Sequence, residues 1–258
     1  MLHHLCTTQA FLRLPAALSR ASRTIRSSPP ATSFCRSGTD VLVAQGTEAG
    51  GHTGTMGLLP FLAGIVRRYP DVPVLAAGGI ADGRTLAAVL TAGADGAWLG
   101  TAFLATPEAV EVHDVHKRLI VESDGSDTVW TRTYDIVSGL PWPANIGARV
   151  RRNRFTDEWS GREATLRDRK EEFAPAQDIN PFEAPPDPDT SQIPYGQSAS
   201  FVDAVRPAAD WSGPSVTRPR QSWPRGLGPC CADRECRAHS RWTVSVPRLG
   251  RVLNSHAH

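Results

Sequence analysis

The chain has 258 residues, a formal net charge of +2, 40% hydrophobic residues and 21% charged residues. This length would suit one (β/α)8 barrel of roughly 250 residues. The nearly balanced charge argues against nucleic acid or another acidic partner. No apolar run reaches the ~18 to 20 residues that a membrane span needs. We therefore expect a cytoplasmic protein that acts neither on nucleic acid nor in a membrane.

Residues 1–38 differ in composition from the rest of the chain. They contain five arginines and several serines, and the first acidic residue is Asp40. An Arg-rich, Ser-rich segment without acids resembles a mitochondrial transit segment, so a mitochondrial location is the alternative. The other interpretation is a leader that is foreign to the fold. Either way, the sequence predicts an irregular segment with no assigned role.

Three βα units can be recognised in order in the central part of the chain. A first strand is predicted over 39–45, an apolar run of the kind buried in parallel sheets. A glycine-rich loop over 46–57 follows it. A helix is then expected over 58–69. Its apolar face would be formed by Leu58, Leu59, Leu62, Ile65 and Val66.

The second strand is predicted over 72–77 and closes on Gly78 and Gly79. Asp82 is a suitable N-cap for a helix over 83–91, which Gly93 terminates.

The third strand is predicted over 95–99 and closes on Gly100. A loop over 101–106 should lead to a helix that opens at Pro107, because proline is favoured at the first helical position. Alternating short strands and amphipathic helices indicate a parallel α/β sheet. All three strands end in glycine, at the edge where such enzymes place their ligands.

The pattern changes after Val121. A strand or extended arm is predicted over 128–137, polar helices over 144–152 and 156–172, and a loop over 174–194. Nothing can be placed beyond about Asp210. One run of arginines is interpreted as a solvated helix face and consists of Arg149, Arg151, Arg152 and Arg154.

The five cysteines have no regular spacing and predict no disulfide framework. Cys231, Cys236 and His239 could be considered as metal ligands. Their spacing fits no common zinc pattern, so we expect no metal site.

The loop AQGTEAGGHTG, residues 44–54, resembles the signature of the nitronate monooxygenase family, formerly called 2-nitropropane dioxygenases. Residues 76–83 (AAGGIADG) and 93–103 (GADGAWLGTAF) resemble the family's next two segments in order and spacing. Later residues resemble its C-terminal part and comprise Thr131 to Tyr134, Gly147 to Phe155 and Tyr195 to Ser198. The resemblance covers about residues 39–209.

The resemblance implies a flavoprotein with a partial TIM-type (β/α) barrel, about its last three to four βα units. The expected domains are a leader over 1–38, an FMN-binding partial barrel over 39–205 and an unassigned, irregular segment over 206–258. A barrel closes only with all its strands. The open edges of a partial sheet therefore predict possible self-association.

Residue roles follow from the same resemblance. His52 would lie near the flavin ring as catalytic acid or base, a task that suits histidine near neutral pH. FMN would be held by Gln45, Gly50, Gly51, Gly78, Gly79, Gly100 and Thr101. Gln45 offers both a donor and an acceptor, and the glycines allow backbone to approach a flat ligand or a phosphate. Tyr195 and Ser198 would approach the flavin, whereas Glu48 is interpreted as a solvated loop residue or a partner for an arginine.

The function implied is oxidation of alkyl nitronates with O2, catalysed with FMN. Two alternatives stay open. One is a flavin-dependent enoyl-acyl-carrier-protein reductase, which shares a similar Gly-Gly-His loop and would need NAD(P)H. The other is an inactive barrel fragment, because several strands of the family's barrel are not recognised in this sequence.

Overall fold

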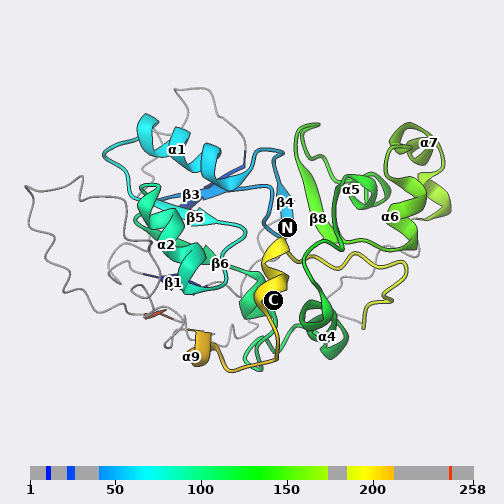
Figure 1. Cartoon of the computed structure of the whole chain (residues 1–258). Helices are drawn as coiled ribbons and strands as arrows, with labels where there is room; N and C mark the ends of the chain where they lie inside the picture. The colour runs from blue at the N-terminus through cyan, green and yellow to red at the C-terminus, as the bar shows by residue number, and fades with distance from the viewer. Residues whose placement is uncertain (1–9, 13–21, 27–40, 174–184, 212–243, 246–258) are drawn as a thin grey trace, which may run out of the picture.

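The computed structural model describes residues 10–12, 22–26, 41–173, 185–211 and 244–245. Figure 1 shows two groups of elements. A sheet with two helices on one of its faces lies at one side, and a smaller sheet followed by short helices lies at the other. The candidate metal ligands Cys231, Cys236 and His239 fall outside the described residues, and no helix among those described is long and apolar enough to cross a membrane.

The larger sheet has the strand order β2-β3-β5-β6-β1-β9. Its centre is parallel and in register, because Gln45 pairs with Ala77 and Ala77 pairs with Trp98. The strand bounds are β1 Ala10–Leu12, β2 Ser22–Ile25, β3 Val41–Gln45, β5 Val74–Ala77, β6 Gly96–Leu99 and β9 Val244–Ser245. β1 and β9 join antiparallel. The parallel α/β architecture predicted from the sequence is confirmed, as an open sheet rather than a closed barrel among the described residues.

The predicted leader is partly wrong. Residues 22–25 form β2, which pairs in parallel with β3, and residues 10–12 form β1 beside β6. Ile25 is 2% exposed and belongs to the main core. This strand is too short and too polar in its first half to be recognised from periodicity alone, because burial against β3 decides its conformation.

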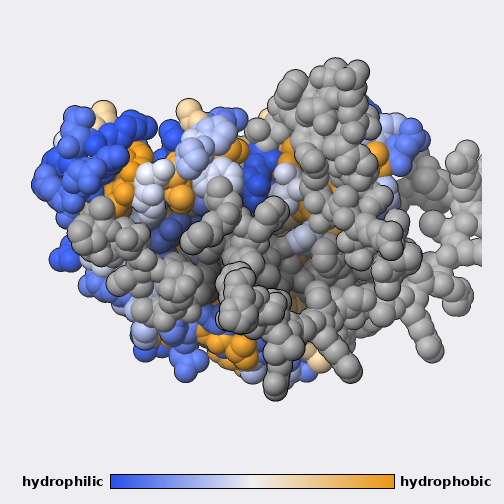
Figure 2. All heavy atoms as spheres, turned by 180° about the vertical axis from the view of Figure 1, so that it is seen from behind, coloured by the Kyte–Doolittle hydropathy of each residue, from blue (hydrophilic) through white to orange (hydrophobic). Residues whose placement is uncertain are grey.

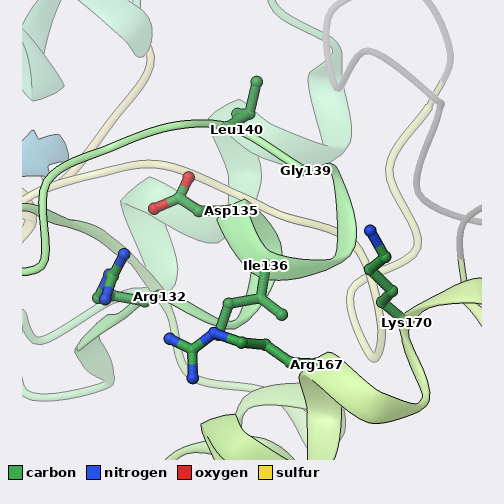
Figure 3. A pocket seen from close by; sticks show the side chains of 7 residues that line it. All are labelled: Arg132, Asp135, Ile136, Gly139, Leu140, Arg167 and Lys170. Carbon is green, nitrogen blue, oxygen red and sulfur yellow. The ribbon is translucent and has the colours of Figure 1, made fainter.

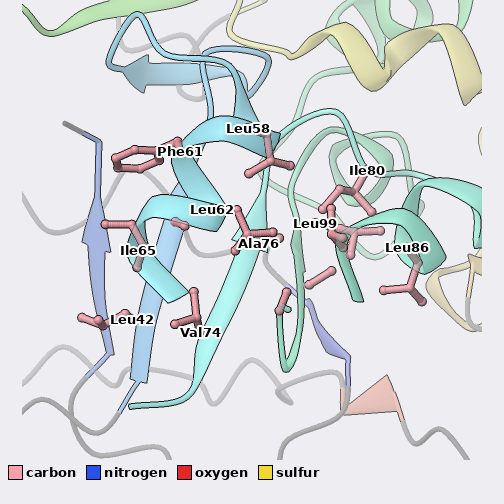
Figure 4. Packing of buried hydrophobic residues seen from close by; sticks show 14 of the residues in the cluster. Leu42, Leu58, Phe61, Leu62, Ile65, Val74, Ala76, Ile80, Leu86 and Leu99 are labelled. Atoms are coloured by element: carbon pink, nitrogen blue, oxygen red, sulfur yellow. The ribbon is translucent and has the colours of Figure 1, made fainter. Parts of the chain in front are cut away.

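Helix α1, Leu58–Arg68, packs on β3 and β5. Leu58, Leu62 and Ile65 are buried as predicted, but Leu59 is 53% exposed and Phe61 takes its place in the core. Helix α2, Gly83–Thr91, begins with the predicted Asp82 cap, which forms a capping box with Thr85. Figure 4 shows how the leucine and isoleucine side chains of these helices meet those of the sheet.

The helix predicted to open at Pro107 is not formed. Helix α3 begins directly at Thr101 and spans Thr101–Leu104, while α4 begins only at Asp114 and spans Asp114–Glu122. Pro107 and Glu108 lie in a turn between them. The Glu108 carboxylate accepts hydrogen bonds from the backbone N–H of Ala208 at 3.0 and 3.1 Å. It therefore holds the start of α9, Ala208–Trp211, instead of continuing a helix of its own.

The smaller sheet is antiparallel in the order β4-β8-β7, with β4 Gly51–Thr53, β7 Thr128–Thr131 and β8 Gly147–Arg151. The helix predicted over 144–152 is therefore wrong. β8 is buried between its two neighbours along Gly147 to Val150, and strand pairing on both sides overrides its weak helical pattern. The predicted strand over 128–137 is confirmed only in its first half, since α5 follows over Thr133–Val137.

Beyond β8 the chain forms short helices over α6 Arg154–Trp159, α7 Glu163–Asp168 and η2 Lys170–Glu172, instead of one helix over 156–172. Gly161, with φ +84°, separates the first two. They pack with α5 around Trp159, Leu166 and Tyr134. Residues 185–196 run without a helix or strand to η3, Gln197–Phe201. Seen from behind, the described surface is mainly hydrophilic, with apolar residues in separate patches (Figure 2).

Candidate functional site

The three predicted glycine loops lie at one edge of the parallel sheet. The loop over 46–57, here called the histidine loop, follows β3, while Gly78–Gly79 follow β5 and Gly100–Thr101 follow β6. Because the three strands are in register, their carboxyl ends meet side by side. Backbone bonds reinforce this, since the N–H of Gly46 donates to the carbonyl of Ala77 at 2.9 Å. The structure therefore brings the predicted cofactor residues together.

The glycines of these loops serve two different purposes. A Cβ on Gly50 would come within 2.6 Å of the backbone of Tyr195, and one on Gly78 within 2.9 Å of the backbone N of Ala49. These two glycines are required by protein packing. In contrast, a Cβ on Gly51 or on Gly100 would meet nothing within 4 Å. Gly51 and Gly100 leave open space beside the backbone that a ligand could use.

Gln45, at the end of β3, has a buried side-chain oxygen without a hydrogen-bond partner among the described residues. A buried acceptor left unpaired is costly, and such atoms call for a specific reason. Gln45 pairs with Ala77 of β5. Gly79, two residues further along, has φ +68° and only the Glu48 side chain near its missing Cβ, at 3.5 Å. A ligand that donates a hydrogen bond to Gln45 would satisfy the unpaired oxygen.

Thr101 binds the backbone of a distant segment. Its hydroxyl is buried and accepts a hydrogen bond from the backbone N–H of Gly196 at 2.9 Å. The carbonyl of Glu48 accepts a further bond from the N–H of Gln197 at 2.9 Å. Residues 195–197 therefore fasten the histidine loop to the turn after β6.

The side chain of Tyr195 points to Asp127. It is fully buried, and its hydroxyl donates to the Asp127 carboxylate at 2.7 Å. Burial raises the pKa of Tyr195 well above its ordinary value, with the Asp127 carboxylate adding to the effect. Ser198 is buried at 5% exposure within η3. The approach of both residues to a flavin stays a prediction.

Glu48 is half-buried rather than solvated. Both of its carboxylate oxygens accept a hydrogen bond from the backbone N–H of Leu58 at 3.0 Å, so it caps the start of α1 from a distance of ten residues. It also raises the pKa of Arg149 electrostatically, although burial of the guanidinium is the larger effect and lowers that pKa overall. Of the two interpretations of Glu48, the partner for an arginine agrees better with the structure than the solvated loop residue.

The arginine run is not a solvated helix face. Arg149 lies on β8 opposite Gly51 and is 8% exposed. Its guanidinium donates to the carbonyl of Thr47 and, at 3.1 Å, to the hydroxyl of Thr128. Arg151 is half-buried and donates to the carbonyl of Pro188 at 2.8 Å. Only Arg152 and Arg154 are exposed.

His52 lies on β4, paired with Ala148 of β8. Its Nε2 is 2.7 Å from Oδ1 of Asp135 in α5, and its side chain is 15% exposed. The ring stacks on Trp142 with centroids 4.2 Å apart and an interplanar angle of 19°. Sequence reasoning missed both partners, because Asp135 lies in a segment that is predicted to be extended and Trp142 lies outside every predicted element.

Arg26, from the predicted leader, also belongs to this site. Its Nε donates to the backbone carbonyl of His52 at 2.7 Å, and its guanidinium lies 5.8 Å from the Trp142 ring centroid. No motif in the sequence signals this contact, because it depends on β2 delivering Arg26 next to β4.

A pocket of about 310 Å³ adjoins Asp135. Figure 3 shows its lining, with Arg132 and Asp135 at the α5 side and Arg167 and Lys170 at the α7 side. The histidine loop lines neither this pocket nor a second one, of about 560 Å³, beside α4.

Comparison with known proteins places this arrangement in a family. The family model described as nitronate monooxygenase matches residues 6–210, so the chain belongs to the nitronate monooxygenase family. The match begins well ahead of residue 39, in agreement with the placement of β1, β2 and Arg26 in the fold.

Among curated relatives, a putative monooxygenase of Mycobacterium tuberculosis is 45% identical over 122 residues, which are 47% of this chain and 30% of that protein. A nitronate monooxygenase of Metarhizium robertsii is 36% identical over 174 residues, 64% of this chain and 46% of that protein. The chain thus spans less than half the length of these two relatives.

Two solved structures have a similar fold. FabK from Thermotoga maritima superposes with a TM-score of 0.65 at 30% identity, covering 76% of this chain and 59% of that one. A nitroalkane oxidase from Streptomyces ansochromogenes gives a TM-score of 0.56 at 30% identity, covering 76% of this chain and 57% of that one.

Proposed function

We propose that this chain carries the histidine and cofactor loops of an FMN-dependent oxidoreductase that oxidises alkyl nitronates with O2. The observation that carries the proposal is the position of His52. It stands beside the carboxyl ends of the parallel strands and is held by a buried carboxylate at 2.7 Å. Membership of the nitronate monooxygenase family supports the substrate class.

The residues at the sheet edge fit FMN. The unpaired, buried oxygen of Gln45 would accept a hydrogen bond from the flavin. The open space beside Gly51 and Gly100 would admit the ring and the phosphate, with Gly79 between them. Gly50, Gly78 and Thr101 would contribute by holding the loops in place. When bound, FMN would supply the electron acceptor that the side chains of this chain lack.

The chain's own residues would supply orientation and proton transfer. His52 would hold or take up a proton close to the anionic substrate, a role that suits an imidazole near neutral pH. Arg149 and the segment 195–197 hold the histidine loop by donating hydrogen bonds to the carbonyls of Thr47 and Glu48. Held in this way, the loop can present His52 without a cost in ordering when substrate arrives.

The test begins with the cofactor. The purified chain is incubated with FMN, desalted and scanned for flavin absorbance, and near-stoichiometric retention is the expected result. O2 uptake is then measured with an alkyl nitronate. His52→Ala should abolish uptake, while His113→Ala, a change in a histidine just ahead of α4, should leave it near the unchanged level.

The other outcomes separate the alternatives. Equal O2 uptake by the His52→Ala variant would remove His52 from catalysis. Oxidation of NAD(P)H that depends on an enoyl thioester would identify an enoyl-acyl-carrier-protein reductase. A protein that retains no flavin would be the inactive barrel fragment. Self-association through the β2 edge of the sheet and a cytoplasmic location stay predictions, and light scattering checks the first.

A further inference from the structure

We propose that Asp135 is a positioning residue that holds the His52 imidazole in the tautomer with its proton on Nε2. Nδ1 is then the ring nitrogen that is available to a substrate. The use of Nδ1 in turnover rests on the proposed function, whereas the tautomer itself does not. Family membership and sequence motifs single out His52 alone, and Asp135 emerges only from the folded structure.

The hydrogen bond sets the tautomer. A carboxylate can only accept hydrogen bonds, so Nε2 must be the donor across the 2.7 Å that separates it from Oδ1 of Asp135. This distance falls in the range of charge-assisted bonds. Asp135 is 2% exposed, so water hardly competes for the contact.

Trp142 prevents the ring from exchanging its two nitrogens. A stack at 4.2 Å and 19° restricts rotation of the imidazole about its own axis, because a flip would drive the ring edge into the indole. The backbone is fixed as well, since Arg26 binds the carbonyl of His52 and β4 pairs with β8. Side chain and backbone are therefore held by separate contacts, as a positioned proton-transfer group requires.

The second carboxylate oxygen argues against a purely structural role. Oδ2 of Asp135 is buried and has no hydrogen-bond partner among the described residues, and such an atom costs stability. The neighbouring pocket, which Asp135 also lines, carries the cationic side chains of Arg132, Arg167 and Lys170. A carboxylate kept at this cost and aimed at one ring nitrogen is better explained by control of His52 than by support of α5.

Nuclear magnetic resonance tests the tautomer without flavin or substrate. The chain is labelled with 15N-histidine at a pH above the titration of its histidines, and the His52→Ala spectrum identifies the His52 signals among the eight histidines. The expected result is a single state with the proton on Nε2. Asp135→Leu should turn it into a mixture of both tautomers. Asp127→Leu is the matched control, because that carboxylate binds Tyr195 rather than a histidine, and it should leave the His52 signals unchanged.

If the leucine variant does not fold, Asp135→Asn replaces it and should also populate both tautomers, since an amide offers a donor as well as an acceptor. A proton on Nδ1 in the unaltered protein overturns the proposal, and so does an unchanged single tautomer in the folded Asp135 variant. In the flavin-loaded protein, the Asp135 variant should lower kcat on the order of 10²-fold with KM changed little. A shifted tautomer combined with full nitronate turnover in His52→Ala supports the positioning role and refutes the proposed function.

Discussion

Gly50 lies against Tyr195 so closely that a Cβ on the glycine would stand 2.6 Å from the tyrosine carbonyl carbon. The contact joins the histidine loop to a segment that follows it by more than a hundred residues. At Gly50, glycine is therefore required by the neighbouring backbone. Part of the family signature is a packing requirement between two backbone segments.

Gly50→Ala should therefore destabilise the fold. The backbone of Tyr195 cannot move aside as a flexible side chain would, so overpacking should lower the free energy of unfolding by about 1–3 kcal/mol. Urea denaturation followed by circular dichroism measures it. Gly100→Ala, where the Cβ meets nothing within 4 Å, is the control. An equal decrease in the free energy of unfolding in the two variants would show that the contact between Gly50 and Tyr195 is not the cause of the destabilisation.

Gly100→Ala should weaken FMN binding and leave the free energy of unfolding unchanged. The methyl group would fill the space that is open beside Gly100, in the turn where the phosphate is proposed to bind. Quenching of flavin fluorescence in a titration gives the dissociation constant, and a rise of at least about tenfold is expected, equivalent to roughly 1.4 kcal/mol. If the affinity for FMN is unchanged, the phosphate does not bind at this turn. Gly64→Ala, in α1, is a control with equally open surroundings.

Arg149→Met should loosen the histidine loop. The guanidinium is buried and donates to the carbonyl of Thr47, which would be left unsatisfied, so a loss of about 1–3 kcal/mol in the free energy of unfolding is expected. Arg152→Met, an exposed neighbour, should change it by no more than roughly 0.5 kcal/mol. Denaturant midpoints compare the two. If the exposed variant lost as much as the buried one, the arginine run would act through its overall charge.

His116 should make stability fall in acid. It is fully buried in α4, and burial lowers its pKa from 6.5 to about 4, an effect that the Pro194 carbonyl partly opposes and His113 adds to. As the pH falls from 6.5 towards 4, the unfolded chain takes up a proton that the folded chain does not, so the free energy of unfolding should drop by roughly 3 kcal/mol. Thermal unfolding from pH 7 to pH 4 follows this.

His116→Gln is the variant that checks this prediction. Glutamine keeps a donor for the carbonyl of Pro194, to which Nε2 of His116 lies at 3.1 Å, but it does not titrate. The drop between pH 6.5 and 4 should therefore be smaller in the variant. An identical pH dependence would assign the acid sensitivity to other groups.

The sequence by itself determined the elements whose signals are local. The Asp82 cap, the α2 helix and the glycines that follow β3, β5 and β6 can all be inferred from neighbouring residues, because capping bonds and chain reversals act over a few positions. The motif around His52 identified the family in the same way. The family match over residues 6–210 confirms that identification.

Only the tertiary structure decided the rest. The β8 strand, the placement of Arg26 and the Asp135 contact, 83 residues from His52, depend on which segments meet in the fold. Pairing with β4 and β7 turns a weakly helical sequence into a strand. The buried carboxylate of Asp135 needs a hydrogen-bond partner, and the fold places His52 beside it. Strand pairing and buried hydrogen bonds join segments that lie far apart along the chain. The loop that carries His52 can therefore be predicted from neighbouring residues, whereas the residues that hold His52 in place cannot.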